Sequence, residues 1–204
     1  MLEAARISCI RNDKTIFQDI SFTLSPGEAL QIVGPNGSGK SSLIRILCTL
    51  LEPDAGELLW HGARVSSGRE AFLAQLRYLG HENGLKSGLT VLENLRFAFA
   101  LAGTPERPPW TEVLAQVGLT GMGDTLAGRL SAGQQRRVAL ARLLLGRARL
   151  WLLDEPFSSL DPAGRALLQR MFAGHCATGG MIVLTAHEPA ALGGLSGPHI
   201  RLPA

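Results

Sequence analysis

A glycine-rich loop between two apolar segments constrains the fold of this chain more than any other feature. Residues 34–41 read GPNGSGKS, which fits the pattern G-x-x-x-x-G-K-[ST] in full. A short apolar run (29–33) precedes the loop, and residues 39–50 carry leucine and isoleucine at helical spacing. A strand, loop and helix in this order aim backbone N–H groups and the positive helix end at phosphate oxygens. The sequence therefore predicts a nucleotide phosphate site, and a chance match is the weaker interpretation.

The loop also assigns roles to single side chains. We expect the Lys40 ammonium to reach the β- and γ-phosphates of ATP, and the Ser41 hydroxyl to bind Mg²⁺. ATP and Mg²⁺ are thus the expected ligands. The residues expected to contact ATP are Gly34, Pro35, Asn36, Gly37, Ser38, Gly39, Lys40, Ser41 and Ser42.

A second apolar run ends in two carboxylates. Residues 150–153 read LWLL and are followed by Asp154 and Glu155. A buried parallel strand delivers such side chains to the sheet edge where ligands bind. We expect Asp154 to hold Mg²⁺ and Glu155 to act as general base toward a water. Taken alone, this run is equally consistent with a strand end followed by a helix cap that has no catalytic role. Paired with the phosphate loop, it indicates a nucleoside triphosphatase.

A third segment narrows the class. It consists of Leu130, Ser131, Ala132, Gly133 and Gln134, with a helical pattern after it. Read alone, it is a helix capped by Ser131. With the other two motifs it resembles the LSGGQ signature of ABC ATPases, with alanine for the middle glycine, and it lies just upstream of the Asp154 strand as in that family.

The resemblance to ABC ATPases implies further roles. Ser159, Leu160 and Asp161 are similar to the D-loop, and His187 to the switch histidine. Lys40, Glu155 and His187 are the implied catalytic residues. His81 stands in the Q-loop place, which usually holds glutamine, and a solvated loop histidine is an equally good interpretation. Arg11 stands where the family usually stacks an aromatic ring on adenine. The family pairs two ATPase subunits head to tail, so that each ATP lies between the phosphate loop of one and the signature of the other.

The order of the segments predicts an α/β fold. Strand patterns on both sides of a mostly helical middle favour a largely parallel sheet with a helical insert. The resemblance refines this to a P-loop ABC ATPase core with an antiparallel N-terminal β region and a helical subdomain that carries the signature motif. We expect one domain over residues 1–204, with residues 1–75 and 148–204 as core and roughly 76–147 as the helical subdomain.

Residues 78–97, YLGHENGLKSGLTVLENLRF, together with LSAGQQRRVALARLLL and LWLLDEPF, resemble the CcmA branch of cytochrome c biogenesis ATP-binding subunits. This resemblance implies a CcmB-type membrane subunit, with CcmC, CcmD and the haem chaperone CcmE, as partners. It also implies a homodimer, ATP hydrolysis linked to release of haem-loaded CcmE, and a peripheral place on the cytoplasmic face of the bacterial inner membrane. The family contacts its membrane partner with the loop 81–90, where Leu85 and Leu89 are the expected exposed apolar contacts.

Composition excludes several other classes. A formal charge of +3 is too mild to indicate a nucleic-acid binder. No run reaches the length of a membrane span or a signal peptide core. The three cysteines are widely spaced, which favours reduced, partly buried thiols. No C-x-x-C-H motif is present, so we expect no direct haem binding. An ABC ATPase for another cargo, such as a drug or a lipid, shares every catalytic motif and stays the alternative.

Overall fold

Two β-sheets of different kinds form the frame of the molecule. The computed structural model describes residues 1–102, 108–189, 192 and 194–203. A five-stranded sheet is parallel throughout, in the order β6 (Leu76–Leu79), β7 (Leu150–Leu153), β8 (Met181–Ala186), β3 (Ala29–Val33) and β9 (His199–Arg201). A four-stranded sheet is antiparallel, in the order β2 (Lys14–Leu24), β1 (Leu2–Arg11), β4 (Ala55–Trp60) and β5 (Ala63–Arg64).

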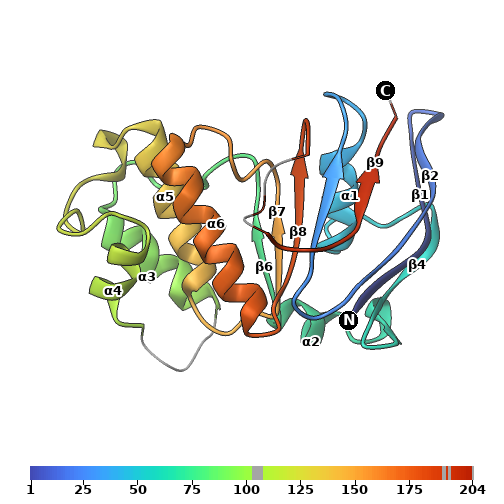
Figure 1. The fold of residues 1–204 in the computed structure, drawn as a ribbon, viewed down its shortest axis with the longest axis horizontal. Helices are drawn as coiled ribbons and strands as arrows, with labels where there is room; N and C mark the ends of the chain where they lie inside the picture. Colours follow the sequence, from blue (N-terminus) through green and yellow to red (C-terminus); the bar gives the residue numbers. More distant parts are fainter. Residues whose placement is uncertain (103–107, 190–191, 193, 204) are drawn as a thin grey trace.

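The helices flank the parallel sheet on two sides (Figure 1). They are α1 (Lys40–Leu47), α2 (Arg69–Ala74), α3 (Val91–Ala102), α4 (Trp110–Gln116), α5 (Ala132–Ala141) and α6 (Pro162–Ala177), with short 3₁₀ turns at Val65–Ser67, Ala127–Arg129 and Arg142–Leu144. Asp161 caps α6, where its side chain accepts a hydrogen bond from Gly164 N, and Pro162 follows as the first helical residue. Within the described residues, no helix is long and apolar enough to cross a membrane.

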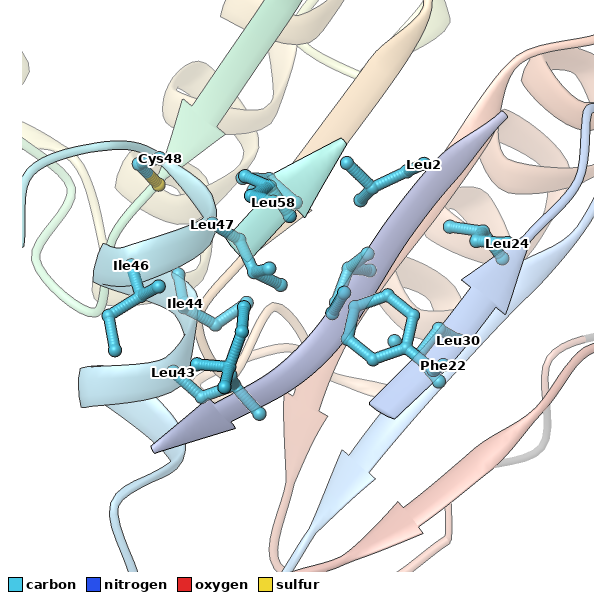
Figure 2. Packing of buried hydrophobic residues seen from close by; sticks show 14 of the residues in the cluster. Leu2, Phe22, Leu24, Leu30, Leu43, Ile44, Ile46, Leu47, Cys48 and Leu58 are labelled. Atoms are coloured by element: carbon cyan, nitrogen blue, oxygen red, sulfur yellow. The ribbon is translucent and has the colours of Figure 1, made fainter. Parts of the chain in front are cut away.

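Alternation along the buried strands gives the parallel sheet two apolar faces. On β7, Leu150 and Leu152 face a core shared with α1 and the antiparallel sheet, and Figure 2 shows the α1 side chains of this core. Trp151 and Leu153 face a second core shared with α5 and α6. A third cluster joins α3, α4 and α5. Because all four residues of β7 are buried, its far end is a rigid platform for the residues that follow.

The expected fold class is confirmed. Strands β3 and β7 have the predicted bounds. The expected start of the helical subdomain at about residue 76 is wrong for residues 76–79, which form β6 and pair with β7. Leu76 and Leu79 are buried there, at the edge of the sheet. Four residues are too few to show a strand period, and pairing with β7 decides their conformation. All three cysteines are buried and unpaired, as predicted.

A half-buried histidine packs against the parallel sheet. The His175 ring stacks on Trp151 with centroids 3.9 Å apart and planes 8° apart. Its Nε2 is buried without a hydrogen-bond partner. Gly180 makes room for the ring, since a Cβ at that position would overlap it. Burial lowers the pKa of His175 from 6.5 to about 4, against a smaller raising effect of hydrogen bonds with the Met181 and Arg149 backbone. The folded protein therefore holds this ring neutral.

This histidine predicts a loss of stability in mild acid. The unfolded chain binds a proton at His175 below pH 6.5, whereas the folded protein does so only near pH 4. Stability from this group is therefore present above pH 6.5 and falls as the pH drops toward 4. His175→Phe keeps a flat ring and removes the titration. Urea unfolding at pH 7.5 and pH 5 should show a smaller difference for this variant than for the wild type. His199→Phe, at an exposed position, serves as control, and an unchanged difference in His175→Phe would contradict the prediction.

Candidate functional site

The loop between β3 and α1 has the shape of a phosphate cradle. Gly37 and Gly39 have φ angles of 82° and 93°, in the left-handed region that favours glycine. A Cβ on Gly39 would overlap Ile16, so this glycine is also required for close packing. Lys40 is 5% exposed, and its Nζ donates to the carbonyls of Gly34 (2.7 Å) and Pro35 (2.9 Å). The backbone of the loop thus fixes the position of the Lys40 ammonium group by hydrogen bonds.

Two polar groups of this loop are available to an anion. The Ser38 hydroxyl is buried and has no hydrogen-bond partner in the protein. The first turn of α1 has no side-chain cap, because its N-cap residue is Gly39. Its backbone N–H groups therefore keep their partial positive charge. A buried orphan hydroxyl beside an uncapped helix start fits phosphate oxygens.

The end of β7 is tied to the end of β8 by one hydroxyl. Thr185 Oγ1 donates to Asp154 Oδ1 at 2.6 Å and accepts from Glu155 N at 2.8 Å. Asp154 N in turn donates to Leu79 O, which continues the β6–β7 pairing by one step. Asp154 is 4% exposed and Thr185 is fully buried. The two carboxylates predicted from the sequence therefore leave the sheet in a fixed orientation.

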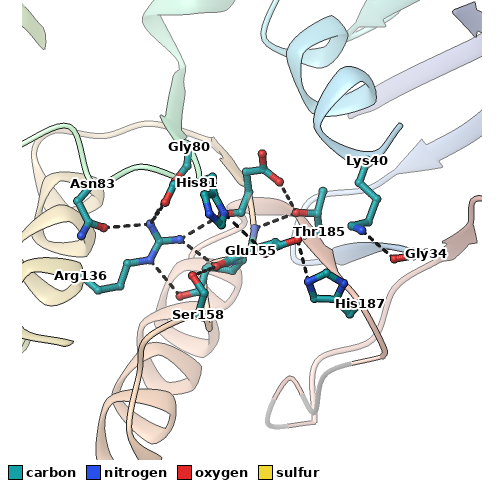
Figure 3. A network of polar contacts seen from close by, with 12 residues as sticks. Gly34, Lys40, Gly80, His81, Asn83, Arg136, Glu155, Ser158, Thr185 and His187 are labelled. Carbon is teal, nitrogen blue, oxygen red and sulfur yellow. Dashed lines mark hydrogen bonds and ion pairs between the residues drawn. The ribbon is translucent and has the colours of Figure 1, made fainter. Parts of the chain in front are cut away.

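Glu155 lies between two histidines (Figure 3). His187 Nε2 is 3.1 Å from Glu155 Oε1, and His81 Nδ1 is 3.6 Å from Oε2. The Glu155 side chain is 21% exposed, whereas those of His81 and His187 are 68% and 53% exposed. The carboxylate is thus partly exposed to water and flanked by two more exposed histidine rings. His81 and His187, the two histidines selected in the sequence analysis, therefore both lie next to Glu155, the predicted general base.

Parallel pairing explains this convergence. The phosphate loop follows β3, Glu155 follows β7 and His187 follows β8, and these three strands are neighbours in the sheet. Since the carboxyl ends of parallel strands meet at one edge, the three segments come together there. Figure 3 shows Lys40, Glu155 and His187 in one view of this edge.

The Leu130–Gln134 segment is not part of this cluster. Ser131 caps α5 in a capping box: its hydroxyl accepts from Gln134 N at 3.2 Å, and Gln134 Oε1 accepts from Ser131 N at 2.9 Å. The cap predicted for Ser131 is confirmed. Helix α5 packs on the opposite face of the sheet from α1 (Figure 1). Ser131 and Ala132 are exposed, and Gly133 and Gln134 are half-buried. One chain therefore leaves this segment open to a partner.

The segment after Glu155 turns sharply into α6. Ser159 has a φ of 61°, a left-handed conformation that is uncommon outside glycine. Leu160 is buried under α6. Asp161 accepts from Gly164 N and from Arg137 Nη2, both at 2.8 Å. These bonds, with the backbone bond first, lower the pKa of Asp161. Arg137 thus links α5 to the start of α6.

The donor set for Mg²⁺ is one hydroxyl and one carboxylate. Ser41 is exposed in the first turn of α1, and Asp154 is buried beside Thr185. These are the hard oxygen ligands that Mg²⁺ prefers, in the small number that it takes from protein when phosphates supply others. Among the described residues, no group of three or more His, Cys, Asp or Glu side chains could hold a metal by itself. The residues present fit an ion that arrives with a nucleotide.

The structure adds residues that sequence reasoning missed and corrects one expectation. Thr185 and Arg136 both bind the Glu155 segment, and nothing in their local sequence indicates this. Leu85 and Leu89 are half-buried rather than exposed, because Leu85 packs on the cluster of α3, α4 and α5. The exposed apolar side chains nearby are Phe97 and Leu101 of α3, 49% and 74% exposed. Arg11 is exposed at the end of β1, next to the hairpin turn.

Comparison with known proteins gives consistent results. Residues 17–158 match the ABC transporter family. The cytochrome c biogenesis ATP-binding export protein CcmA 1 of Salmonella paratyphi A is 49% identical over 189 residues, covering 93% of this chain and 90% of that protein. A bifunctional cytochrome c-type biogenesis protein, CcmAE, of Salmonella choleraesuis is 49% identical, covering 93% of this chain and 55% of that protein. An ABC transporter ATP-binding protein of Pyrococcus furiosus has the same fold, with a TM-score of 0.84 at 24% identity over 98% of this chain and 96% of that one.

The double hydrogen bond of Thr185 predicts a clear stability effect. Thr185→Val keeps the side-chain shape and leaves Glu155 N and Asp154 Oδ1 without their partner. Because Asp154 is buried and the Glu155 N bond is partly buried, we expect a loss of about 1–3 kcal/mol in the free energy of unfolding. Thr185→Ser keeps the hydroxyl and should lose less. Urea unfolding at pH 7.5 measures both variants, and equal stability of Thr185→Val and wild type would refute this role.

Proposed function

Because the chain belongs to the ABC transporter family, and within it to the CcmA cytochrome c biogenesis ATP-binding proteins, we propose that it hydrolyses ATP to power the membrane complex that handles haem for c-type cytochromes. The observation that carries this proposal is the placement of Glu155. It lies between His187 and His81 at the sheet edge that also carries the phosphate loop.

In the proposed ATP hydrolysis, each side chain of the site has a separate role. Backbone N–H groups of Gly34–Ser42 and the Lys40 ammonium bind the phosphates, which places the γ-phosphoryl group near the end of β7. Glu155 accepts the proton of the attacking water, since its carboxylate is partly exposed and fixed by its backbone. His187 donates a hydrogen bond to Glu155 or to the γ-phosphate and orients both. The Asp154 carboxylate and Ser41 hydroxyl would hold Mg²⁺, which supplies positive charge against the phosphates when bound. His81 stands in the Q-loop position and faces the same carboxylate.

The active unit in this proposal is a head-to-tail homodimer. Helix α5 lies on the far side of the sheet from the phosphate loop, and its Leu130–Gln134 segment is open at the helix start. The N-terminus of a helix favours an anion that lies directly in front of it. We therefore propose that this segment contacts the ATP held by the phosphate loop of a second copy. Ser159, Leu160 and Asp161 lie between α5 and Glu155 and line the same junction.

We infer the partners from the similarity of this chain to CcmA proteins. We place the chain on the cytoplasmic face of the inner membrane, bound to a CcmB-type membrane subunit with CcmC and CcmD. A relative named CcmAE supports a functional link to the haem chaperone CcmE, because that name joins both proteins in one chain. In this proposal the chain itself binds ATP with Mg²⁺ and not haem or nucleic acid. Of the expected range 76–147, we keep the part that follows β6 as the proposed helical subdomain that faces the membrane subunit.

The assignment of Glu155 and Lys40 predicts two separable defects. Glu155→Gln keeps the size and the hydrogen bonds but not the basicity, so hydrolysis should fall by about 10²–10⁴-fold while ATP binding persists. Lys40→Ala removes a charge from the phosphates, so ATP affinity should fall by about 10–100-fold. Phosphate release and nucleotide titration measure the two effects. Glu112→Gln, at an exposed position on α4, is the matched control. Hydrolysis by Glu155→Gln at near the wild-type rate would disprove the assignment.

The cargo assignment has its own test in cells. Deleting the gene should deplete mature c-type cytochromes and leave haem-loaded CcmE stranded, and neither Lys40→Ala nor Glu155→Gln should restore them, whereas Glu112→Gln should. Haem staining of membrane proteins measures the outcome. Normal c-type cytochromes in the deletion strain would leave an ABC ATPase for another cargo, such as a drug or a lipid.

A further inference from the structure

Arg136 is the largest fully buried side chain among the described residues, at 1% exposure, and it lies on α5 two residues after Gln134. Its guanidinium reaches two other segments of the site. Nη2 donates to Asp154 O (3.1 Å) and Glu155 O (3.0 Å), and Nε donates to Pro156 O (3.4 Å). Nη1 donates to Gly80 O (3.1 Å), His81 O (3.4 Å) and Asn83 Oδ1 (3.2 Å). Figure 3 shows this cation between the His81 loop and the Glu155 turn.

The Glu155 backbone needs such a partner. Its φ of 47° is left-handed, which costs an ordinary residue about 1–2 kcal/mol. In an extended chain successive residues point to opposite sides, so three consecutive carbonyls meet one cation only where the chain turns. Arg136 binds the carbonyls of this turn, and Thr185 binds Glu155 N on the other side. The two contacts together hold Glu155 in a conformation that it would otherwise leave.

The Nη1 group of Arg136 fixes the loop that carries His81. Nη1 holds the carbonyls of Gly80 and His81 together with the Asn83 amide oxygen. This loop places His81 Nδ1 3.6 Å from the Glu155 carboxylate. A planar guanidinium presents donors in two fixed directions, and a lysine ammonium at the same place is a single point. One arginine therefore sets the distance between His81 and Glu155.

We propose that Arg136 is a positioning residue for ATP hydrolysis, which fixes Glu155 and His81 relative to each other and to the signature helix α5. The proposal rests on the proposed function, because it assigns Arg136 an effect on the base of that reaction. None of its six acceptors, all in the described part of the chain, is a carboxylate. Burial of the cation is costly and lowers the pKa of Arg136, against a smaller raising effect of the Asp154 and Glu155 charges. An apolar side chain would fill the space at lower cost but could not orient the two segments.

The kinetic test compares two arginines that both bind backbone carbonyls. Arg136→Lys should lower kcat by about tenfold or more, with KM for ATP changed less than about threefold, because a small misplacement of a catalytic group affects the chemical step. Arg77 donates to Leu145 O and Leu76 O, away from Glu155, so Arg77→Lys is the matched control and should keep kcat. If Arg136→Lys keeps kcat within about twofold, the proposal is wrong.

A second measurement does not depend on hydrolysis. The five histidine side chains labelled with ¹⁵N give five sets of ring signals, one Nδ1 and one Nε2 signal each, which single His→Gln variants assign. Arg136→Lys should shift the His81 and His187 signals and leave those of His61 and His175 in place, whereas general loosening of the fold would move all of them. If Arg136→Lys does not fold, Asn83→Ala removes one acceptor and should shift the His81 signal alone. Unmoved His81 signals in these variants overturn the proposal. A wild-type protein without ATPase activity would instead reject the proposed function, and the ring signals would still decide the role of Arg136.

Discussion

The hydroxyl of Thr185 holds the site together at the sheet edge. It joins the end of β8 to both residues that follow β7, through a 2.6 Å bond to Asp154 and a 2.8 Å bond from Glu155 N. Strand β7 beneath it is apolar and buried along its whole length, and a one-residue shift would exchange the side chains that pack in its two cores. This edge of the sheet therefore holds Asp154 and Glu155 in fixed positions next to the phosphate loop that follows β3. Orientation of this kind costs nothing at the moment of reaction, because folding has already supplied it.

Around this edge, polar contacts join parts of the molecule that have separate apolar cores. Arg136 and Arg137 leave neighbouring positions on α5, one to the turn after β7 and the other to Asp161 at the start of α6. Arg142 donates to Asn83 O in the same loop that Arg136 binds. The helix that begins with the signature segment is thus connected to the predicted base by directed hydrogen bonds. Apolar packing alone would allow small sliding between these layers, whereas hydrogen bonds with a planar cation fix one arrangement.

Much of the fold could be predicted because the parallel sheet is buried on both faces. Its strands are short apolar runs, and β3 and β7 have the predicted bounds. The edge strand β6 was missed: Arg77 and Tyr78 interrupt the apolar pattern, and only the ladder with β7 makes the segment extended. Strand β4 was missed as well, since its first half is exposed and its pairing partner, β1, is more than 40 residues earlier. Leu85 was misplaced on the surface because a loop sequence does not reveal the cluster under which it packs.

By itself the sequence determined the class of chemistry. Glycines at fixed spacing, a lysine and a serine after them, and two carboxylates at the end of an apolar run are local patterns, and each follows from backbone geometry within a few residues. The tertiary structure decided which of these residues meet. It brought His81 and His187 to Glu155, gave Asp154 its partner in Thr185, and kept the signature helix on the far side of the sheet. Contacts between residues far apart in the chain depend on strand order and on the direction of each side chain, and neither property is written in a short stretch of sequence.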